Sequence, residues 1–175
     1  MLQRLIALDK RIFDYFTKIE HRSRLAEKAM IFFTHLGDWG FIWVVSALLL
    51  ICLRPYRRYG LFCLGSVLAC SFVVNVLLKK TVRRNRPFIP YLPKLTLKIK
   101  LPPDFSFPSG HTAASFAAAG ILAYINPTVA ITAYVVALLI SFSRLYLLVH
   151  YPFDIIVGAV LGAICAFCFS LFMVM

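Results

Sequence analysis

Three short clusters of polar residues carry the side chains that could do chemistry. Together they hold two histidines, a serine, an aspartate and several cations, all at the ends of strongly apolar segments. In sequence letters they are K-x6-R-P at residues 79–87, P-S-G-H at residues 108–111 and S-R-x5-H-x3-D at residues 143–154. Cations bind phosphate oxygens, and imidazoles can attack phosphorus or donate a proton, so this combination points to phosphate chemistry.

The third cluster places His150 four residues before Asp154, with Pro152 between them. Proline is favoured at the first position of a helix, and a carboxylate in the first turn is stabilised by the helix dipole. A carboxylate beside one imidazole nitrogen fixes the tautomer and leaves the other nitrogen free as a nucleophile. The alternative is a capping aspartate beside a histidine at the membrane interface.

The second cluster places Ser109 where a helix N-cap is expected, followed by Gly110 and His111. Free backbone N–H groups and the positive end of the helix dipole make such a terminus an anion site. On its own the cluster could be an ordinary helix start. Because hydrolysis of a phosphate ester needs both a nucleophile and a proton donor, a second histidine here favours the functional interpretation.

The cations differ in how they could bind phosphate. Arg86 and Arg144 have a planar fork that binds two oxygens at once, whereas Lys79 acts as a point charge. Cations at the end of a membrane span can also be interfacial anchors, which is the interpretation given to Lys80, Arg83 and Arg84. We assign no chemistry to the remaining histidines His21 and His35, and we take Asp38 and Asp104 as isolated acids without paired partners.

These clusters must be positioned by membrane helices. Hydrophobic residues make up 61% of the chain, charged residues only 15%, and the mean hydropathy is +0.83, which together indicate an integral membrane protein. We expect an all-helical bundle of about five spans, near residues 41–53, 59–78, 112–125, 127–143 and 155–175. If five spans alternate in direction, all three clusters emerge on the same side of the membrane.

Two segments fall outside these spans. Residues 1–25 show apolar residues at helical spacing between charges, which predicts an amphipathic helix in the plane of the interface; a flap packed on the bundle is the alternative. Residues 88–107 form a proline-rich loop in which Lys94, Lys98 and Lys100 alternate with aliphatic residues. This loop could lie at the lipid headgroups and admit an anionic lipid, or serve as a linker. We treat residues 1–175 as one domain.

The formal net charge of +12 requires anionic partners. Nucleic acid is disfavoured because no recognition motif accompanies the basic residues, which leaves anionic membrane lipids and a phosphorylated substrate. The five cysteines lie in or beside apolar spans and are typical of small buried hydrophobes. Cys165 and Cys168 have the spacing of metal ligands, but neither a second pair nor a histidine lies nearby in the sequence, so we expect no metal and no cofactor.

The three clusters together resemble the three-part signature of the type 2 phosphatidic acid phosphatase (PAP2) superfamily, which also includes vanadium haloperoxidases and glucose-6-phosphatase. Every motif position is matched between residues 79 and 154, and the short chain resembles the small bacterial lipid phosphatases of the superfamily. The resemblance implies that His150 attacks phosphorus to form a phosphohistidine, that Asp154 orients it, and that His111 protonates the leaving group without a metal. It also implies that five residues bind the phosphate: Lys79, Arg86, Ser109, Gly110 and Arg144.

The function implied by the resemblance is removal of a terminal phosphate from a lipid phosphate or diphosphate. Undecaprenyl diphosphate, phosphatidylglycerol phosphate, phosphatidic acid and the 1-phosphate of lipid A are all compatible, and we favour the first two. One alternative is a phosphotransferase that uses the same phosphohistidine. Another is a membrane protein without catalysis that binds anionic lipid through the same basic face.

The side of the membrane on which the clusters lie gives two conflicting expectations. With five spans, the face that carries the clusters holds 16 of the 19 lysines and arginines, which by the positive-inside rule would be cytosolic. Several of these cations have functional reasons to be there, and the bacterial proteins that the chain resembles generally act on the outer face. We therefore expect a multi-pass protein of the bacterial cytoplasmic membrane with an extracytoplasmic site.

Overall fold

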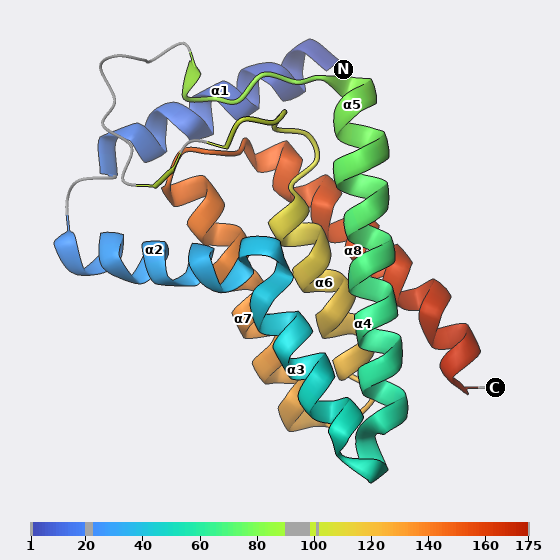
Figure 1. Ribbon diagram of the computed structural model, residues 1–175. Helices are drawn as coiled ribbons and strands as arrows, with labels where there is room; N and C mark the ends of the chain where they lie inside the picture. The colour runs from blue at the N-terminus through green and yellow to red at the C-terminus, as the bar shows by residue number, and fades with distance from the viewer. Residues whose placement is uncertain (1, 20–22, 90–98, 101, 175) are drawn as a thin grey trace.

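The structure, a computed structural model, describes residues 2–19, 23–89, 99–100 and 102–174 (Figure 1). The α-helices are α1 (Leu2–Ile19), α2 (Arg24–Gly37), α3 (Phe41–Cys52), α4 (Arg57–Phe72), α5 (Lys79–Val82), α6 (Gly110–Leu122), α7 (Pro127–Tyr146) and α8 (Pro152–Val174). Short 3-10 turns, η1 (Asp38–Gly40) and η2 (Arg54–Tyr56), join helices, and a π-helical stretch, η3 (Val73–Leu78), connects α4 to α5. The described residues contain no strand, which confirms the all-helical bundle.

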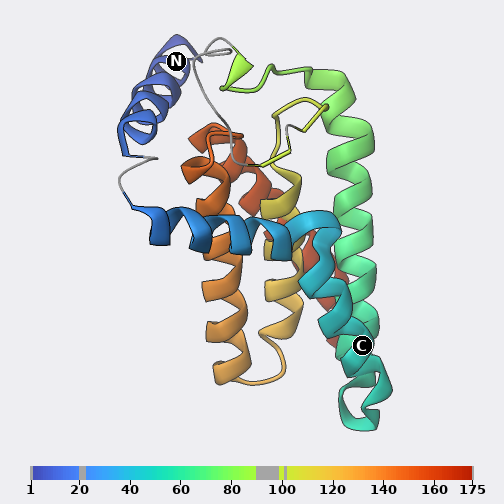
Figure 2. The same cartoon turned by 60° about the vertical axis from the view of Figure 1, so that its left-hand side comes forward.

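Among the described residues, four stretches are long and apolar enough to cross a membrane: Arg24–Cys52, Arg54–Val82, Pro127–Tyr146 and Pro152–Met173. The first of them is bent. Trp39 and Gly40 both have positive φ, at 55° and 69°, so the chain turns sharply between α2 and α3. Figures 1 and 2 show α2 running across the bundle while α3 runs along it. The expected span near residues 41–53 therefore corresponds to α3, and α2 adds a crosswise helix.

The remaining expected span, near residues 112–125, corresponds to α6, which has 13 residues and is not among these four stretches. It lies in the centre of the bundle and contacts α4, α7 and α8. Small residues allow this close packing, because α6 is rich in buried alanine and faces Gly158 and Gly162 of α8. A Cβ on Gly158 would lie 2.7 Å from the carbonyl oxygen of Ser109. The glycine thus lets the start of α8 approach the start of α6.

The core of the bundle lies among α3, α4, α6 and α7. Its buried side chains include Trp43, Val67, Ile121 and Ile140. The indole Nε1–H of Trp43 donates to the hydroxyl of Ser115 on α6 at 2.8 Å, which satisfies two buried polar groups at once. This contact fixes α3 against the central helix that begins at the second cluster.

The N-terminal segment forms the expected helix, α1, at the same end of the bundle as α5 and the starts of α6 and α8 (Figures 1 and 2). It packs on the bundle through Asp9 and Phe13, whose side chains are buried, while Leu8 and Tyr15 are exposed. Its position in the membrane interface stays a prediction.

Half of the proposed headgroup loop, residues 88–107, lies outside the described residues, which leave out 90–98 and 101. The hypothesis for Lys94 and Lys98 therefore stays a prediction. The part of the loop that the structure describes includes Asp104, whose contacts are given below.

Candidate active site

The three clusters meet at one end of the bundle. The first comprises α5 and the residues that follow it, the second begins α6, and the third runs from the end of α7 into α8 (Figures 1 and 2). Side-chain contacts join them across the sequence: Arg86 reaches His150, and the backbone N–H of Ser109 donates to the carbonyl oxygen of Asp154 at 3.0 Å. The structure thus places the polar ends of separate helices together, as alternating spans require.

His150 and Asp154 lie at the start of α8, where Pro152 begins the helix as the sequence indicates. Both side chains are buried, with exposed fractions of 2% and 0%. His150 Nδ1 lies 3.5 Å from Oδ2 of Asp154, but it has no hydrogen-bond partner among the described residues. Asp154 instead accepts hydrogen bonds from Arg84 at Oδ1 (2.7 Å) and from the backbone N–H of Tyr151 at Oδ2 (3.0 Å).

The other imidazole nitrogen of His150, Nε2, lies 3.3 Å from Nη1 of Arg86. A guanidinium can only donate, so this contact needs the lone pair of Nε2 and places the ring proton on Nδ1. Nδ1–H then faces Asp154, and the unprotonated Nε2 faces the cations. This is the tautomer that a nucleophilic histidine requires.

The protonation state of His150 follows from its surroundings. Burial lowers its pKa well below the usual range, and the positive charges of Arg86, Arg144, Lys79 and His111 lower it further. These four residues come from all three clusters. The imidazole is therefore neutral at neutral pH, because its pKa lies on the acid side.

Arg86 is the centre of this arrangement. It is only 3% exposed and donates to three oxygens: Nε to the carbonyl of Asp104 (2.8 Å), Nη1 to the carbonyl of Val149 (2.9 Å) and Nη2 to the carboxylate of Asp104 (2.5 Å). These bonds hold the guanidinium rigidly beside His150. A charged group that is already fixed needs little reorganisation energy to stabilise the negative charge that develops in a transition state.

Asp104 is not the isolated acid that we expected from the sequence. Its carboxylate bridges two of the predicted phosphate-binding cations, with Oδ2 2.5 Å from Lys79 Nζ and Oδ1 2.5 Å from Arg86 Nη2. Burial raises the pKa of this carboxyl, but the hydrogen bond and charge of Lys79, together with Arg86, outweigh it and hold the pKa at about 2. Asp104 is therefore an ionised carboxylate bound where the sequence predicts phosphate.

Asp38 is also paired, so its assignment as isolated was wrong. It lies in η1, and its Oδ1 lies 2.9 Å from Nε2 of His111 while its Oδ2 lies 2.7 Å from Nδ1 of His35. The ring of His111 also packs closely on Gly37, because a Cβ there would lie 2.8 Å from its Cδ2. The bend between α2 and α3 thus carries the residues that orient His111.

The remaining predicted site residues lie around the same centre. Arg144, at the end of α7, is buried and bonds to the hydroxyl of Thr34 on α2, while its Nε has no partner among the described residues. Ser109 is the N-cap of α6, as expected, and its hydroxyl accepts from Thr112. Gly110 lies close to Asn75, because a Cβ there would lie 2.6 Å from the side-chain oxygen of Asn75, which would have to move.

Arg84 was interpreted as an interfacial anchor, and the structure contradicts this. Its guanidinium is paired with Asp154 and with Asp9 of α1, at 2.7 Å each, and lies over the ring of Tyr151. The sequence offers no signal that separates Arg84 from its exposed neighbour Arg83. Asp9 likewise looks like one charge among several on an amphipathic helix.

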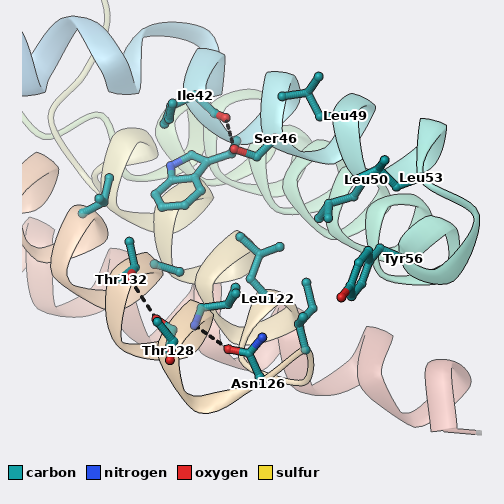
Figure 3. A pocket seen from close by; sticks show the side chains of 15 residues that line it. Ile42, Ser46, Leu49, Leu50, Leu53, Tyr56, Leu122, Asn126, Thr128 and Thr132 are labelled. Atoms are coloured by element: carbon teal, nitrogen blue, oxygen red, sulfur yellow. Dashed lines mark hydrogen bonds between the residues drawn. The ribbon is translucent and has the colours of Figure 1, made fainter.

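Two further features of the described residues concern possible binding sites. The described residues contain no group of three or more histidines, cysteines, aspartates or glutamates that could hold a metal ion. An apolar pocket of about 560 Å³ lies between α3 and the α6–α7 pair (Figure 3). Leu49, Leu50 and Leu122 line it, and none of its lining residues belongs to the three clusters.

Comparison with known proteins gives concordant results. A curated decaprenylphosphoryl-5-phosphoribose phosphatase of Mycobacterium tuberculosis is 33% identical over 74% of this chain and 71% of that protein. An undecaprenyl-diphosphatase of Sulfolobus acidocaldarius is 35% identical over 77% of this chain and 64% of that protein. The crystal structure of a transmembrane PAP2 type phosphatidylglycerolphosphate phosphatase from Bacillus subtilis superposes with a TM-score of 0.78 at 25% identity, over 97% of this chain and 86% of that one.

The family model described as "PAP2 superfamily" matches residues 60–175. This range includes all three clusters and every helix from α4 to α8 apart from the first residues of α4. Because a family model that covers most of the chain agrees with the relatives and with the fold, the chain belongs to the PAP2 superfamily and is a membrane phosphatase of that family.

Proposed function

We propose that this protein hydrolyses the terminal phosphate of a membrane lipid phosphate or diphosphate through a phosphohistidine at His150, without a metal ion. The observation that carries the proposal is the position of His150: a buried imidazole whose unprotonated Nε2 faces Arg86 at 3.3 Å. A neutral nucleophile surrounded by fixed cations is the arrangement that attack on an anionic phosphate requires.

In the first proposed step, Nε2 of His150 attacks phosphorus while the bond from phosphorus to the leaving oxygen breaks. Arg86, Lys79 and Arg144 bind the phosphoryl oxygens together with the free amides at the start of α6, and they stabilise the charge of the transition state. His111 is proposed to be protonated on both ring nitrogens when the anionic phosphate is bound; it keeps Nε2–H on Asp38, gives the proton of Nδ1 to the leaving oxygen and becomes neutral.

In the second step, water attacks the phosphohistidine and His111 takes a proton from that water. The bond between Nε2 and phosphorus breaks, and inorganic phosphate leaves. The imidazole of His150 returns to its neutral form, with the ring proton still on Nδ1 beside Asp154. The two histidines therefore end the cycle as they began it.

For the substrate, we propose a polyprenyl phosphate or diphosphate first, such as undecaprenyl diphosphate. The names of the relatives from Mycobacterium tuberculosis and Sulfolobus acidocaldarius both refer to polyprenyl-linked phosphates. Phosphatidylglycerol phosphate is the next candidate, because it is named for the structural relative from Bacillus subtilis. Phosphatidic acid and lipid A 1-phosphate are compatible with the same chemistry.

A substrate panel tests this proposal. The purified protein in detergent should release inorganic phosphate from at least one of these lipids in the presence of excess EDTA, because no step uses a metal ion. Vanadate, which imitates a five-coordinate phosphoryl group, should inhibit the release. The proposal fails if none of the lipids is hydrolysed, or if activity disappears with EDTA and returns with added metal.

Asp104 leads to a separate prediction. Because its carboxylate binds Lys79 and Arg86, it should compete with phosphate for these two cations. The Asp104 side chain is 45% exposed, so we expect Asp104→Asn to lower the inhibition constant of inorganic phosphate only about threefold to tenfold. The constant is measured by competition against lipid hydrolysis, with Asp14→Asn, an exposed acid on α1, as the control. An unchanged or raised constant would contradict the competition.

We also propose that the site lies on the extracytoplasmic face of the cytoplasmic membrane, in line with the resemblance to small bacterial lipid phosphatases. Lys100 is exposed and belongs to the segment that precedes α6. A cysteine introduced in place of Lys100 should react with a membrane-impermeant thiol reagent in intact cells. If the cysteine reacts only after the cells are opened, the site is cytosolic, as the positive-inside rule alone predicts.

A further inference from the structure

The N-terminal helix is connected through Arg84 to Asp154, the residue that faces the proposed nucleophile. Asp9 on α1 is only 4% exposed, and its carboxylate makes two contacts with the rest of the chain. Oδ2 pairs with Nη2 of Arg84 at 2.7 Å, and Oδ1 accepts the backbone N–H of Phe153 at 3.0 Å. Phe153 lies in the first turn of α8, so Asp9 satisfies one of the amide donors that a helix start leaves without a partner.

Arg84 carries this connection to Asp154. Its Nη1 donates to Oδ1 of Asp154 at 2.7 Å, and its guanidinium lies 4.0 Å from the centre of the Tyr151 ring. Asp154 is fully buried, and its other oxygen accepts from the backbone of Tyr151. With both oxygens bound, the carboxylate has one orientation, the one in which Oδ2 faces Nδ1 of His150 at 3.5 Å.

We propose that Asp9 and Arg84 are positioning residues for catalysis, so that helix α1 is part of the active-site machinery as well as a candidate membrane-surface helix. The proposal rests on the proposed function, in which Asp154 orients His150. Asp9 holds the guanidinium of Arg84, Arg84 holds the carboxylate of Asp154, and this carboxylate sets the tautomer and the angle of the imidazole. None of these contacts is made by the phosphate-binding cations.

The burial of these groups supports a role beyond surface pairing. An exposed ion pair contributes little and tolerates loss of either partner, whereas a buried charge that loses its partner must reorient or attract water. Asp9 and Asp154 are buried, and the Arg84 side chain is 23% exposed. Without Asp9, the guanidinium keeps one of its two carboxylate partners and becomes free to rotate. The position of Asp154 should then vary on the scale that lowers the rate of attack.

The test measures kcat and KM separately. We expect Asp9→Asn to lower kcat about tenfold and Arg84→Gln about thirtyfold to hundredfold, since misplacing a reacting group by about 1 Å has effects of this size. KM should change less than about twofold, because the cations that bind phosphate are untouched. Arg84→Lys keeps the charge and should retain more activity than Arg84→Gln.

A double-mutant cycle separates positioning from general damage to the fold. If Asp9 acts through Arg84, the double variant should be no slower than Arg84→Gln alone, because residues in one network are not additive. Arg83→Gln and Lys10→Gln are the matched controls, because both positions are exposed and each is adjacent in sequence to a member of the network. The kcat of each control should stay within about twofold of wild type, as is usual for exposed positions.

Three outcomes would overturn the inference: a kcat within twofold of wild type for both Asp9→Asn and Arg84→Gln, a raised KM in place of a lowered kcat, or additive effects in the double variant. All rates are expressed per folded, monodisperse protein. If Asp9→Asn does not fold, the comparison of kcat between Arg84→Lys and Arg84→Gln tests the positioning role of Arg84. Wild type and His150→Ala are assayed beside them. If wild type releases no phosphate, the proposed function has failed; if it does and the network variants match it, only this inference has failed.

Discussion

Replacing His150 by alanine should abolish phosphate release from a lipid phosphate, with kcat lowered by at least about 10⁴-fold. The reason is that the variant lacks the atom to which the phosphoryl group is transferred, whereas the surrounding cations stay in place. Release of inorganic phosphate from the best lipid of the panel is the measurement. Residual activity above a few per cent of wild type would show that another group attacks phosphorus.

The same variant separates an enzyme from a membrane protein that only binds lipid. Lys79, Arg86 and Arg144 are unchanged in it, so binding of the lipid phosphate to the detergent-solubilised variant should remain measurable. In the catalytic account, wild type hydrolyses the lipid and the variant only binds it. In the binding account, neither protein releases phosphate.

Arg86→Lys should be the second most damaging substitution. Arg86 donates to the carbonyl oxygens of Asp104 and Val149 and to the Asp104 carboxylate while Nη1 faces His150. A lysine keeps the charge but has a single nitrogen, so it cannot make these contacts together. We expect kcat/KM to fall about 10²-fold to 10³-fold, the usual effect of removing one fixed donor to a transition state.

The control for Arg86→Lys is Arg83→Lys, which makes the same chemical change at an exposed position three residues away. It should have nearly wild-type kcat/KM. A loss smaller than about threefold in Arg86→Lys would mean that charge alone is enough, and that the fork of the guanidinium has no special role.

The parts of this structure that could be predicted from sequence are those that depend on local rules. Ser109 caps α6, Asn126 and Pro127 begin α7, and Pro152 begins α8, because capping residues and prolines act within one helical turn. Apolar length identified the membrane helices. Alternation of those helices then predicted that the three clusters share one end of the bundle.

The bend at Trp39 could not be predicted in this way. The stretch from residue 24 to residue 52 is apolar over much of its length and contains no proline. The sequence therefore indicates a single membrane span with an apolar stretch before it. The sharp turn depends on positive φ at Trp39 as well as at Gly40; the glycine permits this conformation, but a tryptophan gives no sign of it in a sequence. The crosswise direction of α2 follows from that turn and brings Thr34 and Asp38 to the site.

The sequence also could not predict which charged residues pair with each other, and the reason is physical. Asp104 pairs with Lys79 across 25 residues, Asp38 with His111 across 73, and Asp9 with Arg84 across 75. Sequence periodicity reports neighbours within an element and carries no information on which distant charges meet. The resemblance to the PAP2 signature identified candidate reacting residues, and the acids that hold them lie outside that signature.

The central claim is that the phosphoryl group passes through a covalent bond to Nε2 of His150. The direct measurement begins by rapidly mixing the enzyme with a lipid phosphate that carries a radioactive terminal phosphate. The enzyme is then denatured in alkali, in which phosphohistidine survives, and the labelled peptide is mapped by mass spectrometry. The account predicts label on His150, accumulating within one turnover and lost on a chase with unlabelled substrate. Label on another residue would contradict the account. So would hydrolysis by wild type with no labelled enzyme at any time after mixing, if the oxygen taken from water enters the phosphate with inversion of configuration at phosphorus.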